Sequence, residues 1–387
     1  MQLVEVTDAA TAKAFILANV EINKMDPHYI RPLDKDIRQI FDPCRNKTFA
    51  HGEVIRWILE DAQGRLIGRI AAFVNTRYTN KGDDMPVGGI GFFDCINDQR
   101  AADILFDVSK HWLMQRGMHA MDGPVNFGER DRWWGLLVHG FEEPLYCMNF
   151  NPPYYRALFE DYGFRTFYNQ LCFSLEIHKP FHKKILNRHA AVAADPAFQF
   201  VHADKRRLEK FARDFAIVYN KAWAGHEGMK AMPEEQAIRM FRQMKPVMDE
   251  QIVWFVYHHK DPVAIFINLP DLNQWFKYLD GRFSLWDKLR FMRIKKTRTN
   301  TKMVGLVFGI VPEYQGKGVD GYMIVEASKV LQQLAYTQYE MQWIGDFNPK
   351  MINLARRFGE TLNSRTLTTY RYLFDPLKEF NGHPLVG

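Results

Sequence analysis

The sequence is poor in the features by which several large classes of protein are recognised. Only four of its 387 residues are cysteine, and none forms a Cys-x-x-Cys pair or has a histidine at the spacing of a metal site. No apolar run approaches the roughly 20 residues of a membrane-spanning helix. The N-terminal stretch MQLVEVTDAATAK lacks the basic and apolar regions of a signal peptide. We therefore expect a cytoplasmic protein with no metal and no membrane partner. Its thiols should be reduced and mostly buried; they are Cys44, Cys95, Cys147 and Cys172.

The sequence also lacks the signatures of the common hydrolases. It contains no His-Glu-x-x-His, nucleophile elbow, GxxxxGK[ST] or dinucleotide-binding pattern. Metal-dependent, serine-dependent and nucleotide hydrolysis are therefore not indicated. The charge is nearly balanced, with 51 Lys and Arg against 45 Asp and Glu. A net charge of +6 suits a phosphate-bearing small ligand but does not by itself indicate a nucleic-acid partner.

What the chain does have is a hydrophobic content of 47%, an aromatic content of 14% and an internal repeat. Two apolar hairpins, at 54–75 and 251–268, place Trp57 and Trp254 at an offset of 197 residues (254 − 57). Asn151 and Asn348 open two similar segments at the same offset (348 − 151). Two matches at one offset indicate a duplicated unit of about half the chain, although short apolar hairpins can also resemble each other by chance.

Strands alternate with helices in both halves, which indicates an α/β architecture. In the first half Asp8 is expected to cap a helix that runs to about residue 24. We predict domains at 1–178 and 197–387, joined by a linker at 179–196 that has a basic bias and two prolines.

The stretch with most chemical information is MVGLVFGIVPEYQGKGVDGYMIVEASKVLQQL, residues 303–334. An apolar strand leads into a loop with two glycines and then into a helix. Glycine lets successive backbone N–H groups converge, and the helix dipole adds positive potential at the same point. Lys317 adds a full charge. The pattern indicates an anion site, although an ordinary strand-to-helix turn can carry the same glycines.

This stretch resembles the acyl-CoA-binding motif of the GNAT superfamily of N-acetyltransferases, in which Gln or Arg is followed by two residues, Gly, one residue and then Gly or Ala. Gln315 and Gly318 match, whereas Asp320 stands at the last position with Gly321 one place later. The resemblance implies that the loop amides hold the pyrophosphate of acetyl-CoA or another acyl-CoA, and that the pantetheine arm lies beside the preceding strand. The cofactor-binding residues implied are Phe308, Gly309, Ile310, Val311, Gln315, Gly316, Lys317, Gly318, Val319, Gly321 and Asn348.

The segment that begins at Asn348 also resembles the family pattern Asn-x-x-Ala-x-x-Leu-Tyr-x-x-x-Gly. Ala355 falls where the family has the tyrosine that commonly protonates the departing thiolate. A thiolate of pKa about 8.5 can leave without much help, so catalysis is not excluded. Glu340 and Asp346, on or beside the flanking strand, are the candidate catalytic bases; exposed carboxylates at a strand end are the alternative interpretation.

The first half resembles the same fold less closely. Its loop FFDCINDQRAADIL has none of the motif's glycines, and Phe159 occupies the tyrosine position, so we expect a degenerate copy. The resemblance implies an α/β fold of two tandem GNAT-like domains, each a mixed, mostly antiparallel sheet flanked by helices. It implies an N-acyltransferase that uses acetyl-CoA or another acyl-CoA on an unidentified amine. A non-catalytic binding protein on this fold and an aminoacyl-tRNA-dependent transferase are the alternatives.

Two further segments are conspicuous. The stretch WDKLRFMRIKKTRTNTK, residues 286–302, is rich in Lys and Arg and is either a solvated basic loop or an attractor for a phosphate, an acidic substrate or RNA. The loop NFGERDRWWGLLVHGF, residues 126–141, combines charges with two tryptophans and either lines a substrate pocket or packs between the halves.

Overall fold

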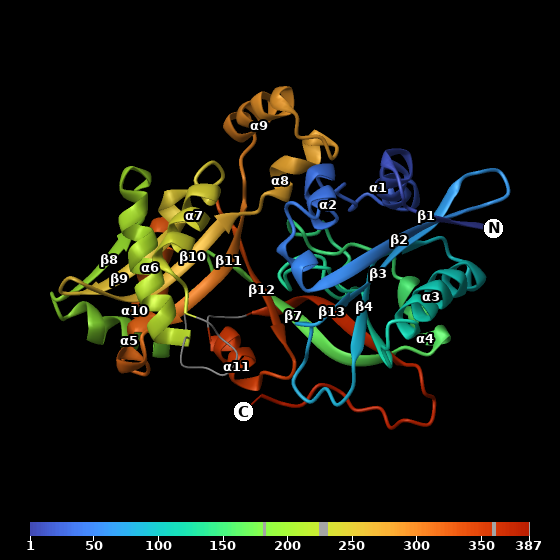
Figure 1. Cartoon of the computed structure of the whole chain (residues 1–387). Helices are drawn as coiled ribbons and strands as arrows, with labels where there is room; N and C mark the ends of the chain where they lie inside the picture. Colours follow the sequence, from blue (N-terminus) through green and yellow to red (C-terminus); the bar gives the residue numbers. More distant parts are fainter. Residues whose placement is uncertain (181–182, 224–230, 358–360, 387) are drawn as a thin grey trace.

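The apolar segments of the sequence form the strands of one mixed sheet, and the amphipathic segments form helices on its two faces (Figure 1). The computed structural model describes residues 1–180, 183–223, 231–357 and 361–386. The strands are β1 (Gln2–Glu5), β2 (Gly52–Glu60), β3 (Leu66–Asn75), β4 (Val87–Cys95), β5 (Ala120–Gly123), β6 (Leu136–His139), β7 (Arg165–Glu176), β8 (Phe198–His202), β9 (Val253–His258), β10 (Asp261–Pro270), β11 (Lys302–Ile310), β12 (Gln338–Gly345) and β13 (Leu362–Leu373).

The helices lie between these strands along the chain. They are α1 (Ala9–Asn23), α2 (Asp34–Ile40), α3 (Gln99–Met114), α4 (Tyr155–Tyr162), α5 (Lys183–Ala193), α6 (Leu208–Trp223), α7 (Glu234–Met244), α8 (Asn273–Phe276), α9 (Leu285–Thr297), α10 (Val319–Leu331) and α11 (Pro349–Arg357). The last strands of the two halves, β7 and β13, begin and end at positions that differ by the same 197 residues as the repeat in the sequence. This agreement supports the inferred duplication.

Helices cover both faces of the sheet, and each half has two layers of core. In the first half α1 and α2 pack on one face, while α3 and α4 pack on the other. In the second half α6 and α7 cover one face, and α10 covers the other together with α11. β4 is buried along its whole length, as expected for a strand with helices on both sides.

The two halves exchange their final strands. The strand order through the middle of the sheet is β5-β13-β7-β12. The last strand of the chain, β13, therefore lies beside β5 of the first half, with Tyr370 opposite Gly123. The last strand of the first half, β7, lies beside β12 of the second half, with Tyr339 opposite Leu175. The sheet is consequently continuous across both halves.

Two buried arginines on β13 fasten it to both halves. Arg371 donates to both carboxylate oxygens of Asp122 on β5, at 2.6 and 2.8 Å. Arg365 donates to Glu340 on β12 at 2.8 Å and to the backbone carbonyls of Glu142 and Glu143 in the first half. Because charges buried in the interior must be paired, these contacts fix β13 between its two neighbours.

Two segments differ from the sequence-based expectation. Residues 179–196, predicted as a linker, contain the helix α5, which packs against α10. The basic stretch at 286–302 is mostly helical and forms the projecting helix α9, rather than a loop. In contrast to these two segments, the predicted cap of the first helix is confirmed, since Asp8 accepts a hydrogen bond from the Thr11 amide at 2.8 Å. Among the described residues no helix is long and apolar enough to cross a bilayer.

Candidate functional site

A cleft begins where two parallel strands of the second half separate. β11 and β12 pair over only four residues, from Lys302 opposite Gln338 to Gly305 opposite Met341. Beyond this point β11 continues beside β10, and β12 continues beside β7. The two strands therefore diverge and leave a gap in the sheet.

Each diverging strand carries a bulge at the point of separation. In β11 the register against β10 shifts and leaves Leu306 as an extra residue. In β12 two residues, Gln342 and Trp343, lie opposite the single residue Cys172 of β7. A bulge bends its strand and re-aims the side chains around it, and bulges of this kind are frequent beside active sites.

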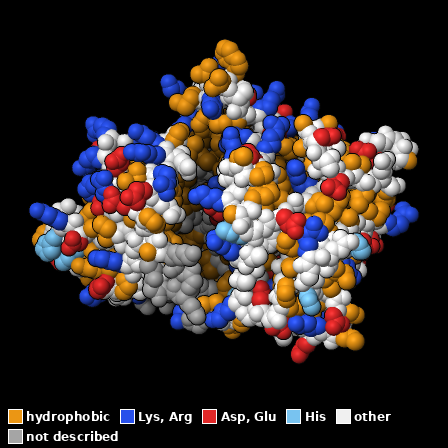
Figure 2. Space-filling view, viewed as in Figure 1, with side chains coloured by type: hydrophobic (Ala, Val, Ile, Leu, Met, Phe, Trp, Pro, Cys, Tyr) orange, Lys and Arg blue, Asp and Glu red, His pale blue; other side chains and the backbone are white. Residues whose placement is uncertain are grey.

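The gap opens into a cleft of about 460 Å³. Its walls are mostly apolar and include Leu306 and Phe308 from β11, Trp343 from β12 and Trp223 from α6. The first half also contributes to it, because Arg130 and Asp131 from the loop after β5 line the cleft. Figure 2 shows this face of the molecule hollowed between the two halves.

The loop that follows β11 is held in a tight turn. The Gln315 side chain donates to the carbonyl of Ile310 at 2.9 Å and ties the loop to the end of the strand. Gly316 and Gly318 have φ of +74° and +91°, which strongly favour glycine. No side chain caps the start of α10, and its dipole favours a negative group there, but Gly318, Val319 and Gly321 are buried and only the preceding residues Gln315–Lys317 are exposed.

Helix α5 packs against the beginning of α10 from the side. A Cβ atom on Gly321 would lie 2.8 Å from Cβ of Arg188 and 3.0 Å from the carbonyl oxygen of Ile185. The predicted contact of Gly321 with a cofactor is therefore replaced by close packing of two helices. Arg188 also pairs with Asp320 at 2.7 Å, so the carboxylate in the motif is compensated by a neighbouring charge.

The other predicted cofactor residues lie on two sides of β11. Phe308 lines the cleft, and Gly309 faces Trp223, whose ring would lie 2.2 Å from a Cβ at that position. Ile310 pairs with β10, and Val311 is buried in the core under α6. Val319, the first residue of α10, is buried against the opposite core layer. Lys317 is exposed beside Tyr314 and borders a separate hollow of about 590 Å³.

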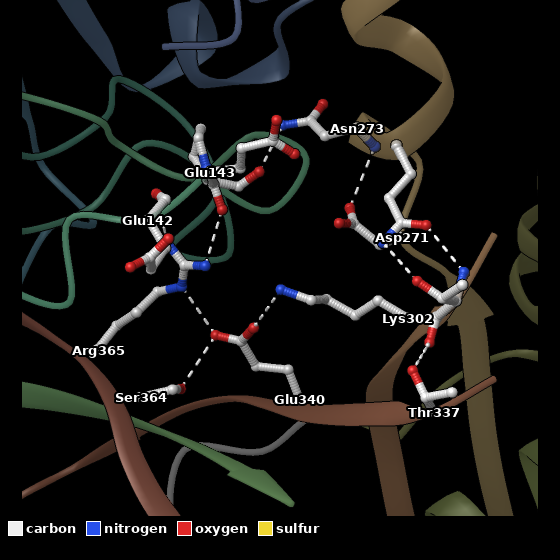
Figure 3. A network of polar contacts seen from close by, with 12 residues as sticks. Glu142, Glu143, Asp271, Asn273, Lys302, Thr337, Glu340, Ser364 and Arg365 are labelled. Atoms are coloured by element: carbon white, nitrogen blue, oxygen red, sulfur yellow. Dashed lines mark hydrogen bonds and ion pairs between the residues drawn. The ribbon is translucent and has the colours of Figure 1, made fainter. Parts of the chain in front are cut away.

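Glu340, predicted as a catalytic base, is at the centre of a buried ion cluster and does not line the cleft (Figure 3). It is 2% exposed and pairs with Arg365 at 2.8 Å and Lys302 at 3.3 Å, while Ser364 donates to it at 3.1 Å. Burial alone would raise the pKa of Glu340, but the two cations outweigh burial and hold the pKa below its ordinary value. A carboxylate stabilised in this way is a poor base, and the prediction is corrected.

Asp346 and Asn348 follow β12 and have structural contacts. Asp346 accepts a hydrogen bond from the side chain of Asn169 on β7 at 2.9 Å. Asn348 accepts from the amide of Met351 at 3.1 Å and so caps α11. Neither residue lines the cleft. Gly359, the last position of the family pattern, lies outside the described residues.

Tyr339 lies at the floor of the cleft, where the strands begin to diverge. Its hydroxyl would lie 2.1 Å from a Cβ on Gly305, so the absence of a side chain there makes room for the phenol. Burial raises the pKa of Tyr339, and the hydroxyl therefore stays protonated at neutral pH. Ala355, which stands where the family has its tyrosine, lines the same cleft.

The sequence-based list missed Asp131, Tyr339 and the aromatic wall formed by Tyr219 and Trp223. The loop at 126–141 was expected either to line a substrate pocket or to pack between the halves: Arg130 and Asp131 line the cleft, whereas Trp133 and Trp134 are buried. Tyr339 has no local signal in the sequence.

The corresponding gap in the first half is closed. β4 and β5 pair over Val87–Gly89 and 120–122 and then continue through a hydrogen bond from the Val125 amide to the Ile90 carbonyl at 2.7 Å. The remaining cavity is about 50 Å³, and Phe159 is fully buried. Among the described residues no group of three His, Cys, Asp or Glu side chains is placed to hold a metal ion.

Sequence comparison finds two curated relatives that align with nearly the whole chain, and no family model matches it. Bacterial ceramide synthase of Caulobacter vibrioides is 24% identical over 368 residues, which is 93% of this chain and 94% of that protein. Protein YghO of Escherichia coli is 25% identical over 362 residues, 90% of this chain and 89% of that protein.

Structure comparison identifies the fold. A tandem GNAT protein from the clavulanic acid biosynthesis pathway superimposes with a TM-score of 0.52 at 10% identity, over 97% of this chain and 99% of that chain. A GCN5-related glucosamine N-acetyltransferase region of a fungal multi-domain β-N-acetylglucosaminidase gives a TM-score of 0.53 at 12% identity, over 96% of this chain and 38% of that chain. The chain thus has the tandem GNAT fold, as the sequence motif predicted.

Proposed function

We propose that this chain is an acyl-CoA-dependent N-acyltransferase whose reaction takes place in the cleft between β11 and β12. The observation that carries the proposal is the combination of diverging strands with an uncapped helix start at the end of one of them. The gap can accept an extended apolar arm as an added strand, and the amides of the loop can bind a pyrophosphate. A bound acyl-CoA supplies an acyl group that is activated as a thioester.

Three residues of the loop have distinct roles in this proposal. Gly316, at a φ of +74°, allows the backbone to turn, and nothing lies within 4 Å of where its Cβ would be, so a ligand can approach the backbone there. Gln315 fixes the loop to β11, and Lys317 adds positive charge nearby. The charge of Asp320 does not oppose an anion strongly, because Arg188 compensates it.

We assign Asp131 as the general base that takes a proton from the acceptor amine. An alkylammonium must lose a proton before its nitrogen can attack a carbonyl carbon. Asp131 lines the cleft and is exposed, and its charge helps to raise the pKa of the adjacent Arg132. Because the side chain is exposed, it can take that proton, whereas the buried carboxylate of Glu340 cannot.

Tyr339 is the proton donor that we assign to the leaving sulfur. Its hydroxyl oxygen lies at the floor of the cleft and keeps its proton at neutral pH. It would take the role that the family gives to the tyrosine on the following helix, where this chain has Ala355.

We further propose that the acceptor is a long-chain amino alcohol and that the acyl group is longer than acetyl. The relative from Caulobacter is called a ceramide synthase, and ceramide is a long-chain amino alcohol acylated on nitrogen. The apolar walls formed by Leu306, Phe308, Trp223 and Trp343 suit alkyl chains better than a polar amine.

The decisive experiment compares two glycine variants. Gly316→Asp places a carboxylate in the proposed pyrophosphate site, whereas Gly64→Asp makes the same change in the β2–β3 turn, at the same φ of +74° and also with nothing within 4 Å. Calorimetric titration with acetyl-CoA and hexadecanoyl-CoA should show binding weakened about tenfold or more by Gly316→Asp, through repulsion of like charges, and unchanged by Gly64→Asp. Equal affinity of both variants would place the cofactor elsewhere.

A second measurement separates the proposal from its alternatives. Release of free CoA thiol should require a long-chain amino alcohol and should be faster with hexadecanoyl-CoA than with acetyl-CoA. Binding of acyl-CoA without thiol release across a panel of amines would indicate a non-catalytic binding protein. Transfer that requires charged tRNA and no acyl-CoA would indicate the aminoacyl-tRNA-dependent reaction.

A further inference from the structure

Helix α9 presents hydrophobic side chains to solvent on one of its faces. Leu285, Trp286, Leu289 and Met292 are exposed by 77%, 81%, 64% and 50%. At 100° per residue, Leu285, Leu289 and Met292 fall within one narrow sector of the helix, and Trp286 borders it. Large exposed apolar side chains are usually scattered singly over a surface, so four of them within eight residues form an unusual patch.

The opposite face of α9 packs against the protein, so the exposed hydrophobic side chains are not needed to hold the helix in place. Phe291 is 4% exposed and packs with Leu272, Trp275 and Phe276 beneath the helix. The helix begins at a complete capping box between Ser284 and Asp287. Its fold is therefore secured by one face and its first turn, and the apolar outer face is free for another role.

Basic side chains lie beside the exposed apolar side chains and among them: at 100° per residue Lys288 and Arg290 border their sector, whereas Arg293 and Lys296 fall within it. Lys288, Arg290, Arg293 and Lys296 are all exposed, and among the described residues none has a carboxylate within 4 Å. Asp287 is the single acidic residue of the helix, and it is engaged by Ser284. Figure 2 shows hydrophobic side chains gathered at the tip of the molecule over α9, with Lys and Arg close by.

We propose that α9 docks on the surface of an anionic phospholipid bilayer. Exposed aliphatic and tryptophan side chains can insert between head groups, while the long Lys and Arg side chains beside and among them reach the lipid phosphates. At 13 residues α9 is far shorter than the roughly 20 residues of a spanning helix, and it lies in an insertion between β10 and β11 that projects from the fold.

The chemistry of the patch favours a bilayer over the other partners that a basic helix could have. Single-stranded nucleic acid would need stacking rings interleaved with the cations, and α9 offers one exposed ring and three aliphatic side chains. The proposal differs from the expectation that the protein has no membrane partner, because that expectation rested on the absence of long apolar runs. It does not depend on the reaction in the cleft.

Flotation of the full chain with lipid vesicles tests the proposal. The protein should float with vesicles of phosphatidylcholine and phosphatidylglycerol, float much less with phosphatidylcholine alone, and dissociate at high salt. Trp286→Ser with Leu289→Ser should weaken flotation about tenfold or more. The matched control, Leu377→Ser with Leu385→Ser, alters side chains that are 93% and 71% exposed elsewhere on the chain and should float as the wild type does.

A charge-neutralising pair tests the contribution of the cations separately. Arg293→Gln with Lys296→Gln should weaken binding to the anionic vesicles about 25-fold, at about fivefold for each charge. Arg77→Gln with Lys81→Gln removes one Arg and one Lys from the exposed β3–β4 connection and should have no comparable effect. All substituted positions are exposed, and thermal unfolding will verify that the variants fold.

Three results would overturn the proposal. One is a wild-type protein that floats with neither vesicle. Another is an α9 variant that floats as well as its control. The third is binding that goes instead to poly(U) RNA or to a second copy of the chain, seen as a mobility shift or as a dimer in sedimentation without flotation.

Discussion

Replacing Glu340 tests whether this residue maintains the fold or acts in the reaction. Glu340→Ala removes the carboxylate that faces Arg365 at 2.8 Å and Lys302 at 3.3 Å. Arg365 is 2% exposed and cannot reach water, so the variant leaves an uncompensated buried charge. Breaking one partner of a buried pair typically costs about 3–5 kcal/mol.

This cost translates into a measurable shift in melting temperature. A chain of 387 residues that unfolds as one unit has an unfolding entropy of roughly 0.8 kcal/mol/K, at about 2.1 cal/mol/K per residue. Dividing the loss of about 3–5 kcal/mol by this unfolding entropy predicts that Glu340→Ala lowers the Tm by about 4–6 °C. Differential scanning calorimetry is the assay.

The matched control is Glu53→Ala. Glu53 pairs with Arg116 at the same distance of 2.8 Å, but its side chain is 56% exposed. An exposed pair contributes at most about 1 kcal/mol, so this variant should lose about 1 °C or less. Equal shifts for the two variants would refute the reasoning, because burial is the difference between them.

The isosteric variant Glu340→Gln separates stability from catalysis. Assayed well below its melting temperature, it should transfer acyl groups at close to the wild-type rate, since the carboxylate lies outside the cleft. Loss of a general base lowers turnover by about 100-fold or more. A fall of that size in a folded Glu340→Gln protein would show that Glu340 acts as the general base after all.

Three further changes address the cleft and its surroundings. Tyr339→Phe should lower turnover by about 100-fold without changing the affinity for acyl-CoA, measured by steady-state kinetics and calorimetry; unchanged turnover would exclude the phenol as proton donor. Asp131→Asn should abolish the acidic limb of the pH profile of kcat, and a profile identical to the wild type would exclude this carboxylate as base. Burial raises the pKa of Asp271 to about 6, so the folded protein retains a proton that the unfolded chain releases, and stability should fall as pH rises from about 4 to about 6. Asp271→Asn should remove up to about 3 kcal/mol of that dependence in urea unfolding, and a dependence equal to the wild type would contradict the assignment.

Local features of the fold were readable from the sequence because their causes are local. The cap at Asp8 and the two glycines at 316 and 318 depend on a few neighbouring residues. The repeat of 197 residues located the two hairpins and the last strand of each half. These signals were sufficient to predict the tandem GNAT fold, whereas the cofactor-binding role of the loop stays a prediction.

The features that the sequence did not predict depend on distant contacts. Glu340 alternates with apolar neighbours in β12 and looks like a strand residue on the solvent face, and only its contact with Arg365 explains its burial. Exposed apolar residues on α9 look like core residues in a sequence, because burial is decided by what packs against them. The exchange of β7 and β13 is invisible for a related reason: two copies of one pattern fit either position equally well.

That exchange makes the order of synthesis important for the first half of the protein. When β5 emerges from the ribosome its eventual neighbour does not yet exist, because Gly123 and Tyr370 are about 250 positions apart along the chain. Until the last strand is made, β5 has an open edge, and β7 is a repeat-related strand able to pair with it wrongly. The last few dozen codons therefore complete the sheet of the N-terminal half as well as that of the C-terminal half. A chain that stops short of them is left with both halves incomplete.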